Sequence, residues 1–145
     1  MTITSLDFQP NQPIPAEFTC DGSNTAPTLE FTDIPINAKS LVLIMDDPDS
    51  PSGVWTHWMM YNIDPLTTIL EQPFPSGVAQ GINTFGEVVY DGPCPHNGLH
   101  HYVFTLYALD EALSFPKPPT RSEIEYALTG HILQSAQLIG TYERQ

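Results

Sequence analysis

The sequence predicts a mainly β fold whose helical part is confined to the C-terminal end. Three apolar runs have the composition of buried strands, at residues 40–45, 57–63 and 102–109. The 15 prolines and nine glycines are spread along the chain rather than collected in one linker. Because proline interrupts helices and central strands alike, we expect many loops between short elements. No alternation of strands and helices is visible, so we expect the strands to be antiparallel.

The strands follow from local patterns along the chain. Residues 1–35 alternate short apolar pieces with Pro and Gly, which is typical of short strands and turns. Residues 40–45 form an uninterrupted apolar run before a proline-rich turn, as in a strand buried on both faces. Residues 57–63 and 102–109 have the same character. Residues 64–90 contain several Gly and Pro residues, so we expect them to wrap the surface between strands.

The pattern changes near the C-terminus, where apolar residues recur at helical spacing. Residues 120–123, Thr-Arg-Ser-Glu, form a capping-box sequence. The residues that follow at helical spacing are Ile124, Ala127, Leu128, His131, Ile132, Ser135, Ala136 and Ile139. We therefore expect helix as far as residue 139. Gly130 either divides this segment into two helices or marks a point where a helix packs closely on the sheet.

The composition argues against several classes of partner. Seventeen acidic residues outnumber four basic ones and give a formal charge of −13. Nucleic-acid binding needs cationic side chains that neutralise phosphates, and attachment to an anionic membrane surface needs a basic patch. The basic residues are Lys39, Lys117, Arg121 and Arg144. We therefore expect no nucleic-acid partner and no electrostatic attachment to membranes.

The length and the N-terminus indicate one domain in the cytoplasm. A chain of 145 residues is most simply a single domain, 1–145, that buries roughly 70% of the surface its unfolded chain exposes. The first eight residues lack the features of a secretory signal, and no apolar stretch approaches the ~20 residues that cross a bilayer. Cys20 and Cys94 both lie in turn-like segments that could meet in a disulfide. For a cytoplasmic protein we expect two reduced cysteines, with the disulfide as the alternative.

Two polar segments beside apolar runs hold most of the reactive side chains, residues 45–58 and 91–102. Together they contain four of the five histidines and three closely spaced aspartates. Strands hold such loop ends rigidly, so their polar groups can converge on one ligand. The two segments therefore predict a pocket.

The aspartates of the first segment have two interpretations. In an extended loop the side chains of Asp47 and Asp49 point the same way, so both carboxylates could face one cavity. A solvated turn is the alternative, because Asp, Ser and Pro are ordinary turn residues. Asp46 is expected to face outward. The Ser50–Pro51 bond is a candidate cis peptide bond.

Two histidines at the starts of strands are candidates for the site. His57 lies between Trp55 and Trp58, where either a nearby carboxylate or a backbone group must satisfy its ring nitrogens. His100 and Tyr102 have i, i+2 spacing and therefore share one face of a strand.

The remaining histidines are expected outside the site. His101 points to the opposite face of its strand, and His96 lies in a solvent-exposed turn. His131 lies on the apolar face of the expected C-terminal helix, which favours a structural role. We expect none of the three to contact a ligand.

Several motifs resemble those of one family. Residues 43–51 (LIMDDPDSP), 55–58 (WTHW) and 92–102 (GPCPHNGLHHY) closely resemble the two signature motifs of the phosphatidylethanolamine-binding proteins. In particular the chain resembles their short bacterial and archaeal Raf-kinase-inhibitor-like branch (YbhB/YbcL type). Further matching segments are residues 19–22, 83–86, 106–110 and 130–133. These segments follow one another in the expected order along most of the chain, so the resemblance is specific.

The resemblance implies a β-sandwich core with short C-terminal helices and a small anion-binding pocket. In the family this pocket receives phosphate-like or carboxylate groups, including phospholipid headgroups. The residues at the pocket positions are Asp47, Asp49, Pro51, Trp55, His57, Gly92, Pro93, His100 and Tyr102. The chain departs from the family where His101 replaces an arginine and His96 replaces a proline. Loss of the arginine removes a permanent charge beside the pocket loop.

An anion beside two carboxylates poses an electrostatic problem, because like charges at ~4 Å repel by several kcal/mol at a near-surface dielectric. Three features could offset this repulsion: a protonated His57 or His100, a proton shared between an aspartate and a ligand oxygen, and backbone N–H groups of the Gly92-Pro93 loop. We therefore predict that anion binding strengthens as the pH falls toward the ordinary histidine pKa of about 6.5.

The leading hypothesis is a non-enzymatic protein that binds phosphate-like or other anionic groups without a cofactor or metal. The resemblance also implies regulation of kinases or other protein partners. The alternative is a phosphohydrolase that uses Asp47, Asp49, His57 and His100 as metal ligands or acid–base groups. No HExxH motif, Gly-rich phosphate loop or serine nucleophile elbow supports that alternative. A third hypothesis, an interaction module that forms a homodimer, follows from the resemblance to short bacterial relatives.

Overall fold

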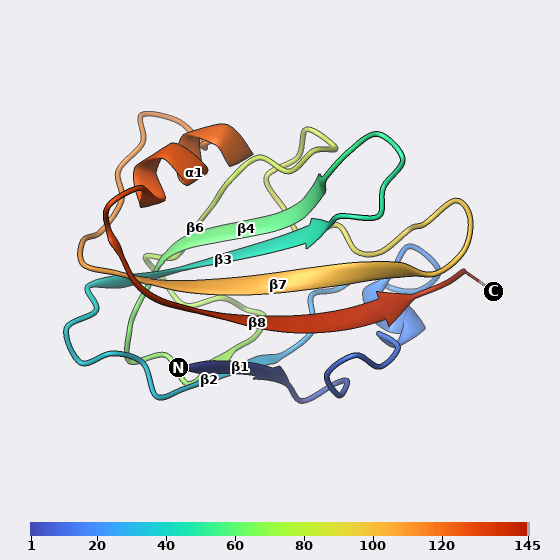
Figure 1. The fold of residues 1–145 in the computed structure, drawn as a ribbon, viewed down its shortest axis with the longest axis horizontal. Coiled ribbons are helices and arrows are strands. Elements are labelled where there is room, and N and C mark those ends of the chain that lie inside the picture. The colour runs from blue at the N-terminus through green and yellow to red at the C-terminus, as the bar shows by residue number, and fades with distance from the viewer. Residues whose placement is uncertain (145) are drawn as a thin grey trace.

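Two antiparallel sheets form the protein in the computed structural model, which describes residues 1–144 (Figure 1). In the described chain the larger sheet has the strand order β6-β4-β3-β7-β8, and the smaller sheet has the order β1-β2-β5. The strands of the larger sheet are β3 (Ser40–Asp47), β4 (Trp55–Ile63), β6 (Ala79–Gln80), β7 (His100–Leu109) and β8 (Ile132–Tyr142). Those of the smaller sheet are β1 (Thr2–Ser5), β2 (Leu29–Thr32) and β5 (Ile69–Leu70). The expected mainly β fold with antiparallel strands is confirmed.

The three apolar runs form the centre of the larger sheet. β3 pairs with β4 on one edge and with β7 on the other, so that Leu43 lies opposite both Met60 and Leu106. Every residue from Leu41 to Met45 is at most 1% exposed. The prediction of a strand buried on both faces is therefore confirmed for β3.

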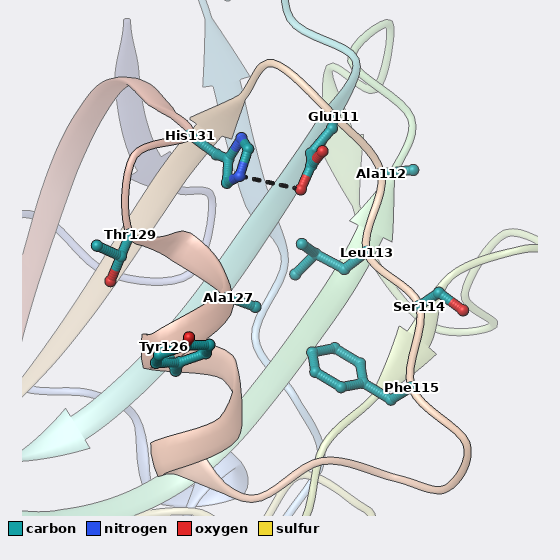
Figure 2. Close-up of a pocket in the computed structure, with 9 residues that line it drawn as sticks. All are labelled: Glu111, Ala112, Leu113, Ser114, Phe115, Tyr126, Ala127, Thr129 and His131. Atoms are coloured by element: carbon teal, nitrogen blue, oxygen red, sulfur yellow. Dashed lines mark ion pairs between the residues drawn. The ribbon is translucent and has the colours of Figure 1, made fainter.

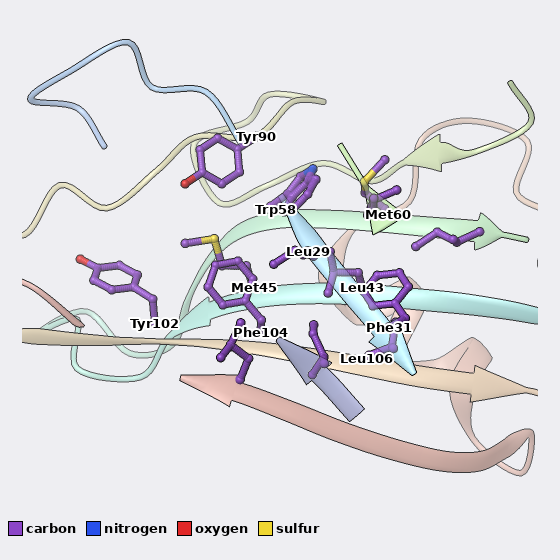
Figure 3. Packing of buried hydrophobic residues seen from close by; sticks show 14 of the residues in the cluster. Leu29, Phe31, Leu43, Met45, Trp58, Met60, Tyr90, Tyr102, Phe104 and Leu106 are labelled. Carbon is purple, nitrogen blue, oxygen red and sulfur yellow. The ribbon is translucent and has the colours of Figure 1, made fainter. Parts of the chain in front are cut away.

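The main core lies between the two sheets. Figure 3 shows Leu29 and Phe31 of β2 packed over Leu43, Phe104 and neighbouring side chains of the larger sheet. Alternate residues of β3 point to the opposite face of the sheet, where a second, smaller core is covered by helix α1 (Arg121–Leu128). This arrangement makes the protein a β-sandwich with a helix on its outer face, as Figure 1 shows.

The C-terminal helix is shorter than its sequence pattern predicts. α1 begins after the expected capping box, in which the Thr120 hydroxyl accepts a hydrogen bond from the Glu123 backbone N–H. Gly130 has a φ of +83°, a left-handed conformation that turns the chain away from the helix. The prediction of helix as far as residue 139 is wrong, because residues 132–142 form β8 and pair with β7 along its whole length. Pairing with a neighbouring strand outweighs the apparent helical spacing there.

The loops contain two further differences from expectation. A short 3-10 helix (Ala16–Phe18) lies in the N-terminal part, so helix is not confined to the C-terminal end. Among the described residues the cis peptide bond lies at Gln72–Pro73, so the candidate at Ser50–Pro51 is wrong. Residues 64–90 contain the two-residue strands β5 and β6 and otherwise run as loops, as expected. No helix in the described part of the chain has the length and apolar character needed to span a membrane.

Candidate functional site

A cavity of about 300 Å³ lies where β3 ends and where β4 and β7 begin. Because these neighbouring strands are antiparallel, the end of β3 meets the starts of β4 and β7, and Asp47 pairs with Trp55. The residues that line this cavity, here called the His57 cavity, are Asp47, Ser50, Pro51, Ser52, Trp55, His57, Phe85, Cys94, Pro95, His96, Asn97, His100 and Tyr102. The two polar segments of the sequence therefore do form one pocket.

The carboxylate of Asp47 is held in the cavity by two hydrogen bonds. Its Oδ2 lies 2.7 Å from Nδ1 of His100, and its Oδ1 accepts a hydrogen bond of 2.8 Å from the backbone N–H of Asp49. Both side chains of the Asp47–His100 pair are buried. Nδ1 of His100 must carry a hydrogen to donate to a carboxylate, so Nε2 is the nitrogen left for a ligand.

His57 is held by the backbone rather than by a carboxylate. Its Nδ1 lies 2.6 Å from the carbonyl oxygen of Asp91, which can only accept a hydrogen bond. Burial lowers the pKa of His57 and outweighs the effects of the Asp91 carbonyl and the Asp47 carboxylate, which raise it. Of the two arrangements open from the sequence, the core histidine bonded to backbone is confirmed. His57 is therefore neutral near neutral pH, and it does not supply the positive charge considered above.

Tyr102 supplies a polar atom that the protein leaves unsatisfied. Its ring stacks on His100 with centroids 6.5 Å apart and meets the edge of His57 at 5.3 Å, and the residue is 0% exposed. The backbone N–H of Cys94 approaches its oxygen, but its hydroxyl hydrogen has no acceptor among the described residues, and the same holds for the buried indole N–H of Trp55. Burial, followed by the Asp47 carboxylate, raises the pKa of Tyr102, so the hydroxyl keeps its hydrogen. Unpartnered buried donors are rare in proteins and call for a ligand or water.

Asp49 does not line the His57 cavity. Its Oδ2 accepts hydrogen bonds from the backbone N–H and from Nδ1 of His101, at 2.8 and 2.7 Å. The hydrogen bond to the His101 ring is the main reason why the pKa of Asp49 is lowered. The expectation that Asp47 and Asp49 face one cavity is therefore wrong for Asp49. β3 ends at Asp47 and the chain then turns, so i, i+2 spacing no longer places two side chains on one face.

The residue that replaces the family's arginine has a clear role. His101 is exposed and pairs with Asp49 on the outside of the sheet, as its strand position predicts. Asp46 also faces away from the cavity, as expected, and accepts hydrogen bonds from the Thr56 hydroxyl at 2.7 Å and from Arg121 at 3.1 Å.

Gly92 and Pro93 support the cavity wall and do not line it. The backbone N–H of Gly92 donates to Oδ1 of Asn24 at 2.8 Å, and proline has no N–H. Neither Gly92 nor Pro93 therefore has a free backbone N–H for an anion. A Cβ at Gly92 would lie 2.1 Å from the carbonyl oxygen of Phe18, so only glycine fits there.

The wall also contains a disulfide. Cys20 and Cys94 are bonded, and Cys94 lines the His57 cavity. The preference for two reduced cysteines is therefore corrected in favour of the alternative. The backbone N–H of Cys20 also donates to the carbonyl of Pro93 at 3.1 Å, which shows that the two loops run side by side.

Several lining residues escaped the sequence interpretation. His96 is exposed, as expected, but it lines the cavity. The expectation that it lies outside the site is therefore wrong. Phe85 reaches the cavity from the loop between β6 and β7 and contacts Trp55 edge-on, with centroids 5.2 Å apart. The resemblance of residues 83–86 to the family was the one feature of the sequence that could have indicated Phe85. The other additional lining residues are Ser50, Ser52, Cys94, Pro95 and Asn97.

A second, wider groove of about 530 Å³ lies between α1 and the loop after β7 (Figure 2). His131 borders it and pairs with Asp110 at 2.8 Å and with Glu111 at 3.2 Å. The expected place of His131 on the apolar face of a helix is wrong, because this residue lies between α1 and β8. None of the predicted pocket residues lines this groove.

Comparisons with known proteins agree with the geometry of the fold. The model of the phosphatidylethanolamine-binding protein family matches residues 4–143. The chain is 44% identical to a UPF0098 protein from Methanothermobacter thermautotrophicus over 150 residues, which cover 99% of each chain. It is 42% identical to a UPF0098 protein from Chlamydia trachomatis over 149 residues, again 99% of each chain.

Two solved structures are similar over nearly their whole length. One is the crystal structure of a putative phosphatidylethanolamine-binding protein homolog, CT736 from Chlamydia trachomatis, with a TM-score of 0.94 and 42% identity over 99% of this chain and 97% of that chain. The other is Escherichia coli YbcL, described as a new member of the mammalian family, with a TM-score of 0.91 and 27% identity over 99% and 98%. By the family model, its close relatives and its fold, the chain belongs to the phosphatidylethanolamine-binding protein family.

Proposed function

We propose that this chain binds small ligands through a phosphate or carboxylate group in the His57 cavity. The observation that carries the proposal is the Tyr102 hydroxyl, which is buried and keeps its hydrogen, and that hydrogen has no acceptor in the described protein. A buried donor without a partner costs about 1–3 kcal/mol, which a ligand oxygen would recover. The indole N–H of Trp55 is a second donor of the same kind.

The negative charge of the site is partly dispersed before a ligand arrives. Each oxygen of Asp47 already accepts one hydrogen bond, from His100 Nδ1 and from the backbone of Asp49. Hydrogen bonds to a carboxylate are stronger than those between neutral groups, so they reduce the repulsion that an anion would meet.

His57 and His100 can each contact a ligand through one ring nitrogen. His57 Nδ1 is committed to the Asp91 carbonyl and His100 Nδ1 to Asp47, so each ring has one nitrogen for contact with a ligand. In the described part of the chain no three His, Cys, Asp or Glu side chains are arranged to hold a metal ion. A phospholipid headgroup and a phosphorylated side chain both carry the proposed group, so regulation of a kinase or another partner would act through the same cavity.

Calorimetric titration with methyl phosphate tests the proposal. We expect saturable binding, and we expect Tyr102→Phe to weaken it by about tenfold because one hydrogen bond to an anion is lost. Tyr126→Phe is the matched control, since Tyr126 is 84% exposed and lies on the second groove rather than on the His57 cavity.

The same samples test the enzymatic alternative. Release of inorganic phosphate from methyl phosphate by the purified protein, lost in His57→Phe, would replace the binding proposal with hydrolysis. Absence of binding at every pH between about 5 and 8 would overturn the binding proposal itself.

A further inference from the structure

We infer that the His57 cavity selects an anion that carries its own proton, such as a hydrogen phosphate group, over anions without one, such as sulfate. The inference rests on the proposed function, because it names the protonation state of the group bound at that site. Its basis is the pattern of hydrogen-bond donors and acceptors that the cavity presents.

The tautomer of His57 follows from its one hydrogen bond to the protein. Nδ1 lies 2.6 Å from the carbonyl oxygen of Asp91, and a carbonyl cannot donate, so Nδ1 carries the hydrogen. In a neutral ring the other nitrogen, Nε2, then has a lone pair and accepts hydrogen bonds. No hydrogen bond to Nε2 forms within residues 1–144, and His57 lines the cavity. The ring therefore offers an acceptor to a ligand.

The surroundings keep His57 neutral although the charged groups that act on it are acidic. These groups are Asp46 and Asp47 of β3 and Asp91 of the loop before β7, and the rings of Phe85 and Tyr102 meet its ring edge-on. The carboxylates favour a protonated ring, but burial opposes it more strongly and the side chain is only 3% exposed. No lysine or arginine is found among the described residues that line the cavity.

Asp47 adds a second acceptor to the same cavity. Its two oxygens each accept one hydrogen bond from the protein and keep further lone pairs, and a carboxylate cannot donate. The donors are the Tyr102 hydroxyl and the Trp55 indole. A ligand that satisfies both kinds of group must accept hydrogen bonds on one side and donate on the other.

A hydrogen phosphate group meets this requirement and a sulfate does not. The P–OH hydrogen can be donated to Nε2 of His57 or to Asp47, while the other oxygens accept from Tyr102. A sulfate near neutral pH has only acceptor oxygens, so it meets the lone pairs of His57 and Asp47 directly. Sites built to hydrogen-bond one hydroxyl reject analogues without it by large factors, because a polar group of the site is left unpaired.

His100 offers a different explanation for pH-dependent binding, which the experiment must separate. If protonation of His100 creates the binding site, any small anion of suitable shape binds better at acidic pH. If the ligand's own proton is required, only anions that carry one bind, and their affinity follows the ligand's ionisation.

Methyl phosphate and methyl sulfate form the matched ligand pair for calorimetry between about pH 5.5 and pH 8. The methyl phosphate monoanion and methyl sulfate have the same charge and nearly the same shape, and differ by one hydroxyl. We expect methyl phosphate to bind at least tenfold more tightly at the acidic end. Above its second pKa of about 6, its affinity should fall by up to tenfold per pH unit, as the monoanion is lost.

The outcomes separate this inference from the proposed function. Equal affinities for the two ligands, or tighter binding of the methyl phosphate dianion, would agree with the proposed anion site. Either result would contradict the inference that the ligand must carry a proton. Failure of both ligands to bind would overturn both proposals.

Two variants and one spectrum complete the test. We expect His57→Phe to flatten the pH dependence of methyl phosphate binding, and Tyr102→Phe to weaken binding without changing that dependence. Nitrogen-15 spectra of histidine-labelled protein report the tautomer directly, even if His57→Phe fails to fold. A hydrogen on Nε2 of His57 in the free protein at neutral pH would contradict the inference.

Discussion

Asp47 and His100 form a buried pair at the junction of β3 and β7, with 2.7 Å between Oδ2 and Nδ1. The pair joins the end of one central strand to the start of its neighbour and forms part of the wall of the His57 cavity. One contact therefore contributes to the stability of the sheet and to the chemistry of the site.

Asp47→Asn separates these two contributions. The amide keeps the shape but only one acceptor oxygen, so it can accept from His100 Nδ1 or from the Asp49 backbone N–H, and the other donor loses its acceptor. We expect the free energy of unfolding to fall by about 1–3 kcal/mol, the cost of a buried donor left without an acceptor. Urea unfolding measures this loss. Asp49→Asn is the control, because Asp49 pairs with His101 at the surface and should change stability by at most about 0.5 kcal/mol. Equal losses in both variants would contradict the assigned role of Asp47.

The disulfide predicts a larger effect. Cys20 and Cys94 are 74 residues apart in sequence, and closing a loop of that length restricts the unfolded chain by about 4 kcal/mol. We expect Cys20→Ser/Cys94→Ser to lower the free energy of unfolding by about that amount. We also expect weaker ligand binding, because Cys94 lines the His57 cavity. Reduced wild-type protein should behave like the double variant, and a reducing agent should not affect the variant. A double variant as stable as oxidised wild type would contradict this prediction.

The buried neutral ring of His57 predicts a loss of stability at mildly acidic pH. Its pKa in the folded protein is lowered by burial, whereas in the unfolded chain it is about 6.5. Below pH 6.5 the unfolded chain therefore binds a proton that the folded protein does not, so stability falls as the pH falls, by up to about 1.4 kcal/mol per unit. The fall ends at the pKa of the folded state.

His57→Phe should remove this pH dependence. The variant should also lose about 1 kcal/mol at neutral pH, because the Asp91 carbonyl loses its partner. Unfolding free energies measured between about pH 5 and pH 7.5 give the slope. His96→Ala is the control, since His96 is an exposed residue and its removal should leave the slope unchanged. A slope that persists in His57→Phe would assign it to another group.

Sequence patterns predicted the site where it is built on strands. His100 and Tyr102 were placed correctly because the twofold alternation of a strand fixes which side chains share a face. Asp49 was misplaced because it follows the end of β3, where that alternation stops. The contact between Cys20 and Cys94 could not be derived from local patterns, since it depends on two loops that meet only in the folded protein.

The central strands of the fold were also predictable from local patterns. The prediction failed at β8, where the local pattern is weak. The apolar runs of β3, β4 and β7 are unambiguous because their residues are buried on both faces. In β8 the residues from Ile132 to Gln137 are mostly exposed, so their hydrophobic pattern carries little information about the strand. Its structure depends on hydrogen bonds to β7, which a single segment of sequence does not reveal.

Gly92→Ala tests whether the disulfide-bearing wall of the His57 cavity has to pack closely against the N-terminal loop. A Cβ at Gly92 would lie 2.1 Å from the Phe18 carbonyl oxygen and 2.8 Å from Oδ1 of Asn24, so the two loops must separate. We expect a loss of about 2 kcal/mol in the free energy of unfolding and weaker binding of methyl phosphate. Gly77→Ala is the control: Gly77 has a φ of +90° and open space around it, so alanine there costs about 1 kcal/mol of backbone strain. Because Gly77 does not line the His57 cavity, its variant should bind methyl phosphate normally. Normal binding by Gly92→Ala would show that the wall tolerates separation of the loops.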